Sequence, residues 1–205
     1  MRRANAQLQS DRRTEILDAA ERCFARSGFH GASMQEICTE AGMSPGNLYR
    51  YFPSKEELIA GISERNRANA AASFSAVGEA PSFWDGLAEL GRHHLVDRSE
   101  SEVGLCAEIM AESRRNPAIA QLYQDIENDI KGRIAAMLRL AVERGEVRAD
   151  LDVDAAASVL MVLGDGMSWR RAVAPDFDAE RVLPMILKMV RCLLTKPDEQ
   201  SAENP

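Results

Sequence analysis

Side chains that can form specific hydrogen bonds with nucleic acid gather in residues 46–51, which read GNLYRY. An asparagine can pair with two atoms of an adenine edge, and hydroxyl and guanidinium groups donate to phosphate oxygens. A helix here has few apolar anchors beyond Leu48 and Phe52, so its amide, phenol and guanidinium groups remain outward. Such a helix is poor material for a protein core and is suited to the groove of double-stranded DNA.

Residue patterns that carry out reactions do not occur in the sequence. It contains no glycine-rich phosphate loop, no HExxH and no GxSxG, and its three histidines and four cysteines show no metal-ligand spacing. Glu108 and Glu112 stand one helical turn apart, but the neighbouring Arg114 and Arg115 favour a solvated charged face. We therefore expect no catalytic residue, no metal, no cofactor and no enzymatic activity. The four cysteines lack any CxxC pair, which indicates buried, reduced thiols.

The polar stretch lies within a pattern of two short helices joined by a tight turn. Ser33 and Glu36 have the spacing of a capping box, in which the hydroxyl and the carboxylate each bind a backbone N–H at the helix start. Gly42 stands where a helix commonly ends in the left-handed conformation. Ser44 followed by Pro45 begins the next helix, with serine as the N-cap and proline in the first turn. The pattern predicts a helix-turn-helix whose second helix reads DNA.

The stretch AGMSPGNLYRYFPSKEEL resembles the tetracycline-repressor (TetR) family of bacterial transcriptional regulators. The resemblance covers roughly residues 10–70 and implies a set of DNA contacts. Phosphate contacts are expected from Ser33, Ser44, Tyr51 and Lys55. Base edges are expected to face Pro45, Gly46, Asn47 and Tyr49, although several relatives place a polar or basic residue where Pro45 stands. Arg12 and Arg50 complete the expected DNA-binding set.

The rest of the chain predicts an all-α fold of about nine helices in two domains. We expect a flexible basic arm over residues 1–9 and a first helix from Asp11 to Ser27. A helix-turn-helix domain would span residues 10–70, a helical ligand-binding and dimerisation domain 71–196, and a polar tail 197–205. No apolar run approaches the ~20 residues of a membrane span, so we expect a cytoplasmic protein that is associated with the nucleoid when bound to DNA.

Charge is unevenly distributed along the chain. The net charge of −7 argues at first against a nucleic-acid partner. Residues 1–67, however, carry ten Lys and Arg against nine Asp and Glu, whereas residues 68–205 carry fifteen against twenty-three. The acidic excess therefore belongs to the second domain, and the first is locally compatible with DNA.

The last two predicted helices are apolar on more than one face, which a soluble monomer cannot easily cover. We therefore expect a homodimer formed through these helices. The expected interface residues are Val159, Leu163, Gly164, Met167, Ile186, Met189, Val190 and Leu193. Two symmetric copies would require a near-palindromic operator.

Regulation by a small molecule is the remaining expectation, and it rests mainly on the family resemblance, which also favours repression. An apolar pocket is expected from Phe74, Trp84, Leu87, His94, Cys106, Ile109, Met110, Tyr123, Met161 and Trp169. The same composition is equally typical of a plain core. The negative second domain favours an apolar or cationic ligand. The alternative is a DNA-binding regulator that has no small-molecule ligand and is controlled by a partner protein or is constitutive.

Overall fold

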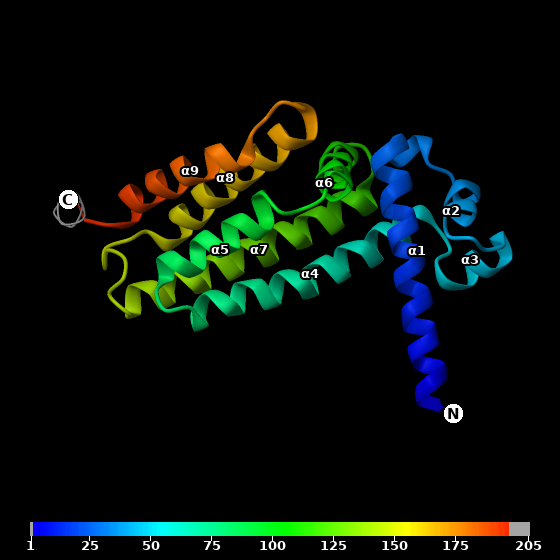
Figure 1. Cartoon of the computed structure of the whole chain (residues 1–205), viewed down its shortest axis with the longest axis horizontal. Helices are drawn as coiled ribbons and strands as arrows, with labels where there is room; N and C mark the ends of the chain where they lie inside the picture. The colour runs from blue at the N-terminus through cyan, green and yellow to red at the C-terminus, as the bar shows by residue number, and fades with distance from the viewer. Residues whose placement is uncertain (1, 197–205) are drawn as a thin grey trace. The chain divides into compact units, whose positions relative to one another are not determined.

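The structure is a computed structural model that describes residues 2–196. The described chain forms nine α-helices and no strand, which confirms the all-α prediction. The helices are α1 (Arg2–Gly31), α2 (Met34–Glu40), α3 (Pro45–Tyr51), α4 (Lys55–Glu79), α5 (Phe83–Leu95), α6 (Glu100–Ser113), α7 (Pro117–Glu143), α8 (Val153–Val173) and α9 (Ala179–Leu194) (Figure 1). None of these helices is long and apolar enough to cross a membrane.

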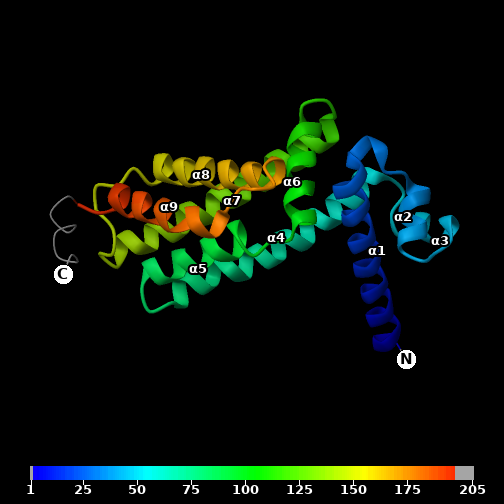
Figure 2. The ribbon, with the colours of Figure 1, turned by 45° about the horizontal axis from the view of Figure 1, so that its top comes forward.

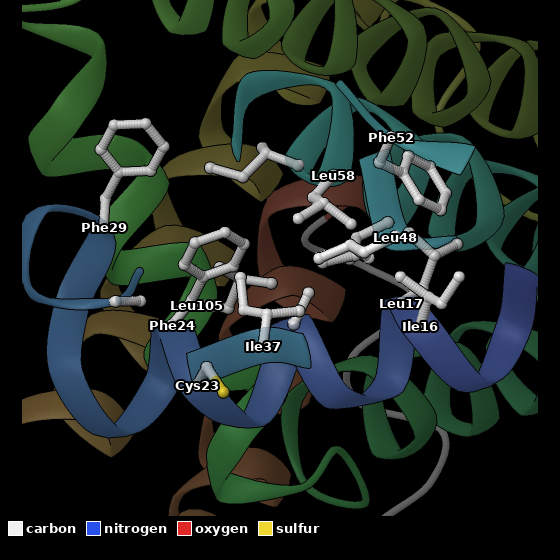
Figure 3. Packing of buried hydrophobic residues seen from close by; sticks show 14 of the residues in the cluster. Ile16, Leu17, Cys23, Phe24, Phe29, Ile37, Leu48, Phe52, Leu58 and Leu105 are labelled. Carbon is white, nitrogen blue, oxygen red and sulfur yellow. The ribbon is translucent and has the colours of Figure 1, made fainter. Parts of the chain in front are cut away.

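The first compact unit, unit 1, contains described residues 2–67 together with 99–124. Its core packs α1, α2, α3 and the start of α4 around residues such as Ile16, Phe24 and Leu58 (Figure 3). Leu105, Ile109 and Ile119 join the same core, so α6 and the start of α7 belong to this unit. The sequence instead assigned these residues to a continuous second domain that began at residue 71. The difference arises because helical periodicity identifies an apolar face without naming the partner that covers it.

Helix α1 begins earlier and ends less simply than the sequence suggested. It starts at Arg2 rather than Asp11, so residues 2–9, expected to form an arm, are helical. The segment RRANAQLQ contains neither glycine nor proline and consists mostly of good helix formers. Gly28 adopts a φ of 69° and breaks the helical path, after which one more turn continues to Gly31. A first helix that ends at Ser27 was expected, and the positive φ of Gly28 marks that end.

The second compact unit, unit 2, contains described residues 68–98 and 125–196. Helices α5, α8 and α9 contact one another, and α8 and α9 lie side by side (Figure 2). The larger core includes Phe83, Leu138 and Leu194, and a smaller one surrounds Met167 and Leu183. Asp152 and Asp178 cap α8 and α9 by accepting hydrogen bonds from the backbone N–H groups of Ala155 and Arg181, each at 3.0 Å.

Candidate nucleic-acid interface

Helices α2 and α3 form the helix-turn-helix that the sequence predicted. The Ser33 hydroxyl accepts a hydrogen bond from the Glu36 N–H at 3.1 Å, so Ser33 is the N-cap of α2. Gly42 adopts a φ of 63°, and the next N–H, on Met43, donates to the carbonyl of Cys38 at 3.0 Å. Ser44 is the N-cap residue of α3 by position, but its hydroxyl makes no capping hydrogen bond among the described residues. The hydroxyl therefore remains available to a ligand.

Only half of the expected capping box at Ser33 forms. The Glu36 carboxylate accepts from Arg26 at 2.9 Å and from Ser27 at 3.3 Å instead of returning to the N-cap backbone. The hydrogen bond from Arg26 is the main reason that the pKa of Glu36 lies below its usual value. An arginine at 2.9 Å outcompetes a neutral N–H for the carboxylate, since hydrogen bonds between charged groups are the stronger ones.

Helix α3 has one buried anchor and several outward groups. Leu48 is completely buried, while Tyr49 leaves 50% of its surface exposed. Pro45, Gly46 and Arg50 are also exposed. Asn47 and Tyr51 are half-buried, and Tyr51 packs against the core of unit 1. The structure thus brings all six expected α3 residues together on one short helix.

The two arginines near the start of the chain differ in their surroundings. Arg12, which the sequence selected, forms an ion pair with Glu15 on the same helix. Arg13, which it did not select, places its guanidinium 4.4 Å from the centre of the Phe52 ring and donates to the Tyr51 carbonyl at 3.5 Å. Arg13 therefore lies at the C-terminal end of α3. Sequence reasoning missed it because its partners stand 38 and 39 positions away.

Lys55, for which a phosphate contact was expected, binds two backbone carbonyls of its own unit. Its ammonium donates to the carbonyls of Phe29 at 2.5 Å and Ala32 at 2.9 Å. It also lies 4.6 Å from the centre of the Phe29 ring. The side chain is only partly accessible to solvent. Two of its three N–H donors are thereby directed into the protein.

The pair Glu108 and Glu112 forms no solvated face, contrary to the sequence interpretation. Glu112 is 3% exposed and accepts from His30 Nε2 at 2.9 Å and from Arg115 at 3.2 Å. Glu108 accepts a hydrogen bond from the Phe29 N–H at 3.1 Å. Both carboxylates therefore hold the last turn of α1, residues 28–31, against α6. The spacing of one helical turn was visible in the sequence, but the partner some 80 residues away was not.

The expected pocket residues do not share one compact unit. Cys106, Ile109, Met110 and Tyr123 belong to unit 1, where Ile109 is buried in the core and Tyr123 packs against it. Trp169 is 47% exposed on α8 and is a member of neither core of unit 2. In unit 2, Leu87 is buried in the core, against which Phe74, Trp84 and Met161 pack. The Phe74 ring stacks with that of His94 at 6.2 Å, and Arg191 lies 5.1 Å above the Trp84 ring.

Phe74 also lines a cavity of about 450 Å³ within unit 2. Helices α4, α5 and α7 and the following turn supply its walls, with Phe83, Met137 and Leu140 among the apolar residues. Glu79, Arg133, Arg144 and Glu146 supply its charges. The cavity combines apolar walls with a few ionic groups, which is the usual composition of a small-molecule site.

The expected dimer residues divide into exposed and buried groups. Val159, Met189 and Leu193 are exposed. Met167 and Val190, at 3% and 2% exposure, are core residues of the chain itself, so their assignment to an interface is wrong. Leu163, Gly164 and Ile186 have intermediate solvent exposure, and Leu163 and Ile186 pack against the larger core of unit 2. The sequence did not assign the other large exposed apolar residues of these helices to the interface, which are Val162, Trp169, Val173 and Met185.

The cysteines follow the expectation only in part. Cys23 and Cys38 are buried, and burial raises the pKa of both thiols. Cys106 is intermediate and Cys192 is exposed. No group of three or more potential metal-ligating side chains occurs within residues 2–196.

Comparison with known proteins gives matches over both parts of the chain. Residues 16–62 match the model "Bacterial regulatory proteins, tetR family", and residues 92–195 match "BetI-type transcriptional repressor, C-terminal". The HTH-type transcriptional regulator UidR of Escherichia coli K12 is 35% identical over 168 residues, which cover 82% of each chain. GusR of Salmonella enterica has a TM-score of 0.77 at 33% identity, covering 90% of this chain and 95% of that one. A transcriptional regulator from Saccharomonospora viridis in complex with choline has a TM-score of 0.75 at 26% identity, covering 88% and 95%.

Proposed function

Because this chain belongs to the TetR family of bacterial regulatory proteins and is a transcriptional regulator, we propose that it is a homodimeric repressor that a small molecule releases from its operator. The observation that carries this proposal is the division of α3 into a buried anchor at Leu48 and an exposed polar side at Tyr49. A helix fixed on one side and polar on the other is suited to the major groove. The match to a repressor-type C-terminal model favours repression over activation.

Contacts to the operator are assigned by residue type and exposure. Pro45, Gly46, Asn47 and Tyr49 face base edges, where Asn47 can pair with adenine and Pro45 can touch a thymine methyl group. The hydroxyls of Ser33 and Ser44 donate to phosphate, and so do the basic side chains Arg12, Arg13 and Arg50 together with Tyr51. The absence of an internal cap on the Ser44 hydroxyl supports its place in this set.

Dimerisation involves the exposed apolar sides of α8 and α9. Val162 and Met185 are 68% and 67% exposed, and Val159, Trp169, Met189 and Leu193 extend the same kind of surface. Soluble monomers seldom expose contiguous apolar surface of this kind without a partner. A two-fold dimer places its two reading helices ~34–36 Å apart on one face of DNA, which requires a near-palindromic operator.

The ligand proposed here is small and apolar or cationic. The choline complex of the Saccharomonospora viridis regulator provides a precedent for a cation in this fold. In this chain the cavity that Phe74 lines offers the rings of Phe74 and Phe83 for cation–π contact and the carboxylates of Glu79 and Glu146 for charge, beside the guanidinium groups of Arg133 and Arg144. Helix α4 contributes Leu58 and Ile62 to the core of unit 1 and packs Phe74 against the core of unit 2. A ligand that binds beside Phe74 can therefore shift the helix that also supports the DNA-binding residues.

The experiment that tests this function selects binding fragments from random DNA with the full chain. A near-palindromic consensus and a dimer on each fragment are expected. Operator affinity is then measured with choline as the first probe, where a coupling of ~1–3 kcal/mol produces a useful switch. Failure to enrich any fragment contradicts the DNA-binding assignment. An enriched operator whose affinity responds neither to choline nor to other small apolar or cationic compounds favours a constitutive or partner-controlled regulator.

A further inference from the structure

We propose that Lys55 is a positioning residue for operator binding, which fixes the start of α2 by holding the carbonyls of Phe29 and Ala32. The inference rests on the proposed DNA-binding function and replaces the direct phosphate contact that the family resemblance implied. Lys55 is the first residue of α4; its partner Phe29 lies in the last turn of α1, after the break at Gly28, and its partner Ala32 lies between α1 and α2. All of these residues belong to unit 1.

The ammonium of Lys55 is engaged on three sides. It donates at 2.5 Å to the Phe29 carbonyl and at 2.9 Å to the Ala32 carbonyl, and its third neighbour is the Phe29 ring at 4.6 Å. Carbonyls at the end of a helix have no partner within that helix, and a cation there is favoured by the helix dipole. The charge of Lys55 therefore stabilises the C-terminal end of α1.

Residues 28–32, which Lys55 holds, are also fixed by other hydrogen bonds. Gly28 takes a φ of 69°, and the Ala32 N–H donates to the Gly28 carbonyl at 3.1 Å. Glu108 accepts from the Phe29 N–H at 3.1 Å, so the Phe29 residue is held through its N–H by α6 and through its carbonyl by α4. Phe29 and Ala32 are both buried.

Ser33, the N-cap of α2, follows Ala32 directly. The hydrogen bonds around Gly42 then tie the end of α2 to the start of α3. The position of Ala32 therefore determines where the Ser33 hydroxyl and the reading helix lie. Loss of the ammonium leaves two carbonyls of a buried turn without their donor, and the turn loosens.

The test compares Lys55→Met with Arg50→Gln in the full chain on a selected operator, at several salt concentrations. A cation that touches phosphate contributes ~0.9 to the slope of log affinity against log salt. Arg50 is exposed on α3, so Arg50→Gln is expected to reduce the slope by about this amount. Lys55→Met is expected to lower affinity roughly tenfold at every salt concentration while the slope stays at the parent value. A slope reduced by ~0.9 in Lys55→Met overturns the proposal, because it identifies a phosphate contact.

A double-mutant cycle with Ser33→Ala tests whether Lys55 acts through the start of α2. Residues that act through one another are non-additive, so Lys55→Met should cost less in the Ser33→Ala background than in the parent. The control is the cycle of Lys55→Met with Tyr49→Ala. The two losses of operator affinity should add, because the carbonyl contacts of Lys55 are expected to affect Ser33 more than Tyr49 on α3. Full additivity in the Ser33 cycle contradicts the proposed path.

Hydrogen exchange tests the same proposal without DNA. Faster exchange of the Ala32 amide is expected in Lys55→Met and unchanged exchange in Arg50→Gln. Unchanged exchange in both variants overturns the proposal. If the parent binds no operator, the proposed function fails, and the exchange result still decides whether Lys55 holds the turn. Lys55→Gln, which retains a polar side chain, serves in both experiments if Lys55→Met does not fold.

Discussion

At the scale of single residues, α3 places a buried anchor beside an outward side chain. Leu48 is buried in the core of unit 1, while Tyr49 directs half of its surface to solvent. Because the buried anchor and the proposed DNA contact are different residues, we expect that DNA affinity and stability can be changed independently.

Replacement of Tyr49 by alanine should weaken operator binding by ~1–3 kcal/mol and leave the unfolding free energy nearly unchanged. The matched control is Leu48→Ala at the adjacent buried position, which should cost ~2–5 kcal/mol of stability. Binding titrations and urea unfolding of both variants measure the two effects. Equal operator affinity of Tyr49→Ala and the parent would remove Tyr49 from the base-contacting set.

Asp165 on α8 provides a second prediction at this scale. Burial raises the pKa of its carboxyl above the usual value. The folded chain then holds the proton more tightly than the unfolded chain, so this group lowers stability as the pH rises through the two pKa values. Asp165→Asn should therefore raise the melting temperature at pH 7, and the gain should vanish in acid below the ordinary aspartate pKa. A gain that persists in acid would show that the charge is not responsible.

Individual site residues were predictable from the sequence where their role depends on near neighbours. The outward residues of α3 and the N-cap at Ser33 follow from spacing and turn chemistry. Arg13 and Glu112 were missed or misinterpreted and the carbonyl contacts of Lys55 were not predicted, because each of these residues acts on a partner between 23 and 82 positions away. No local pattern contains that information.

At the scale of elements, the last turn of α1 is the point at which α1, α4 and α6 are joined. Gly28 supplies the conformation, Lys55 of α4 holds the carbonyls, and Glu108 and Glu112 of α6 hold the N–H of Phe29 and the ring of His30. The sequence predicted about nine helices and the N-cap positions at Ser33 and Ser44. It did not predict that α6 belongs with α1, since its apolar face could equally cover another helix.

Two glycine substitutions test this account of the turn. Gly28→Ala should destabilise the chain by ~1–2 kcal/mol, because a φ of 69° is unfavourable for alanine and the new Cβ would lie 2.9 Å from Glu108 Oε2. Gly46→Ala is the control, since its Cβ meets nothing within 4 Å. It should stabilise α3 by ~0.5–1 kcal/mol and yet weaken operator binding, because it adds a methyl group to the proposed DNA face.

Thermal or urea unfolding measures the two stabilities, and an operator titration measures the affinity of Gly46→Ala. Unchanged stability of Gly28→Ala would show that the turn tolerates a different backbone path. Unchanged affinity of Gly46→Ala would show that DNA does not approach this part of α3.

At the scale of the whole molecule, exposed apolar side chains of α8 and α9 indicate association with a second copy. Val162→Glu should produce folded monomers with weakened operator binding, since a charge at an exposed site affects only the proposed interface. Val190→Asp is the matched contrast, because Val190 is a core residue and a buried charge there should unfold unit 2. Sedimentation and circular dichroism separate these outcomes. A parent that sediments as a monomer at micromolar concentration contradicts the dimer.

The exposed thiol of Cys192 has a practical consequence. It stands on α9 between Met189 and Leu193, whereas Cys23 and Cys38 are enclosed in the core of unit 1. An alkylating fluorophore should therefore modify Cys192 well before those two thiols. If α9 lies in the dimer seam, the rate of modification should fall as protein concentration rises, so the natural sequence already carries a reporter of its own assembly.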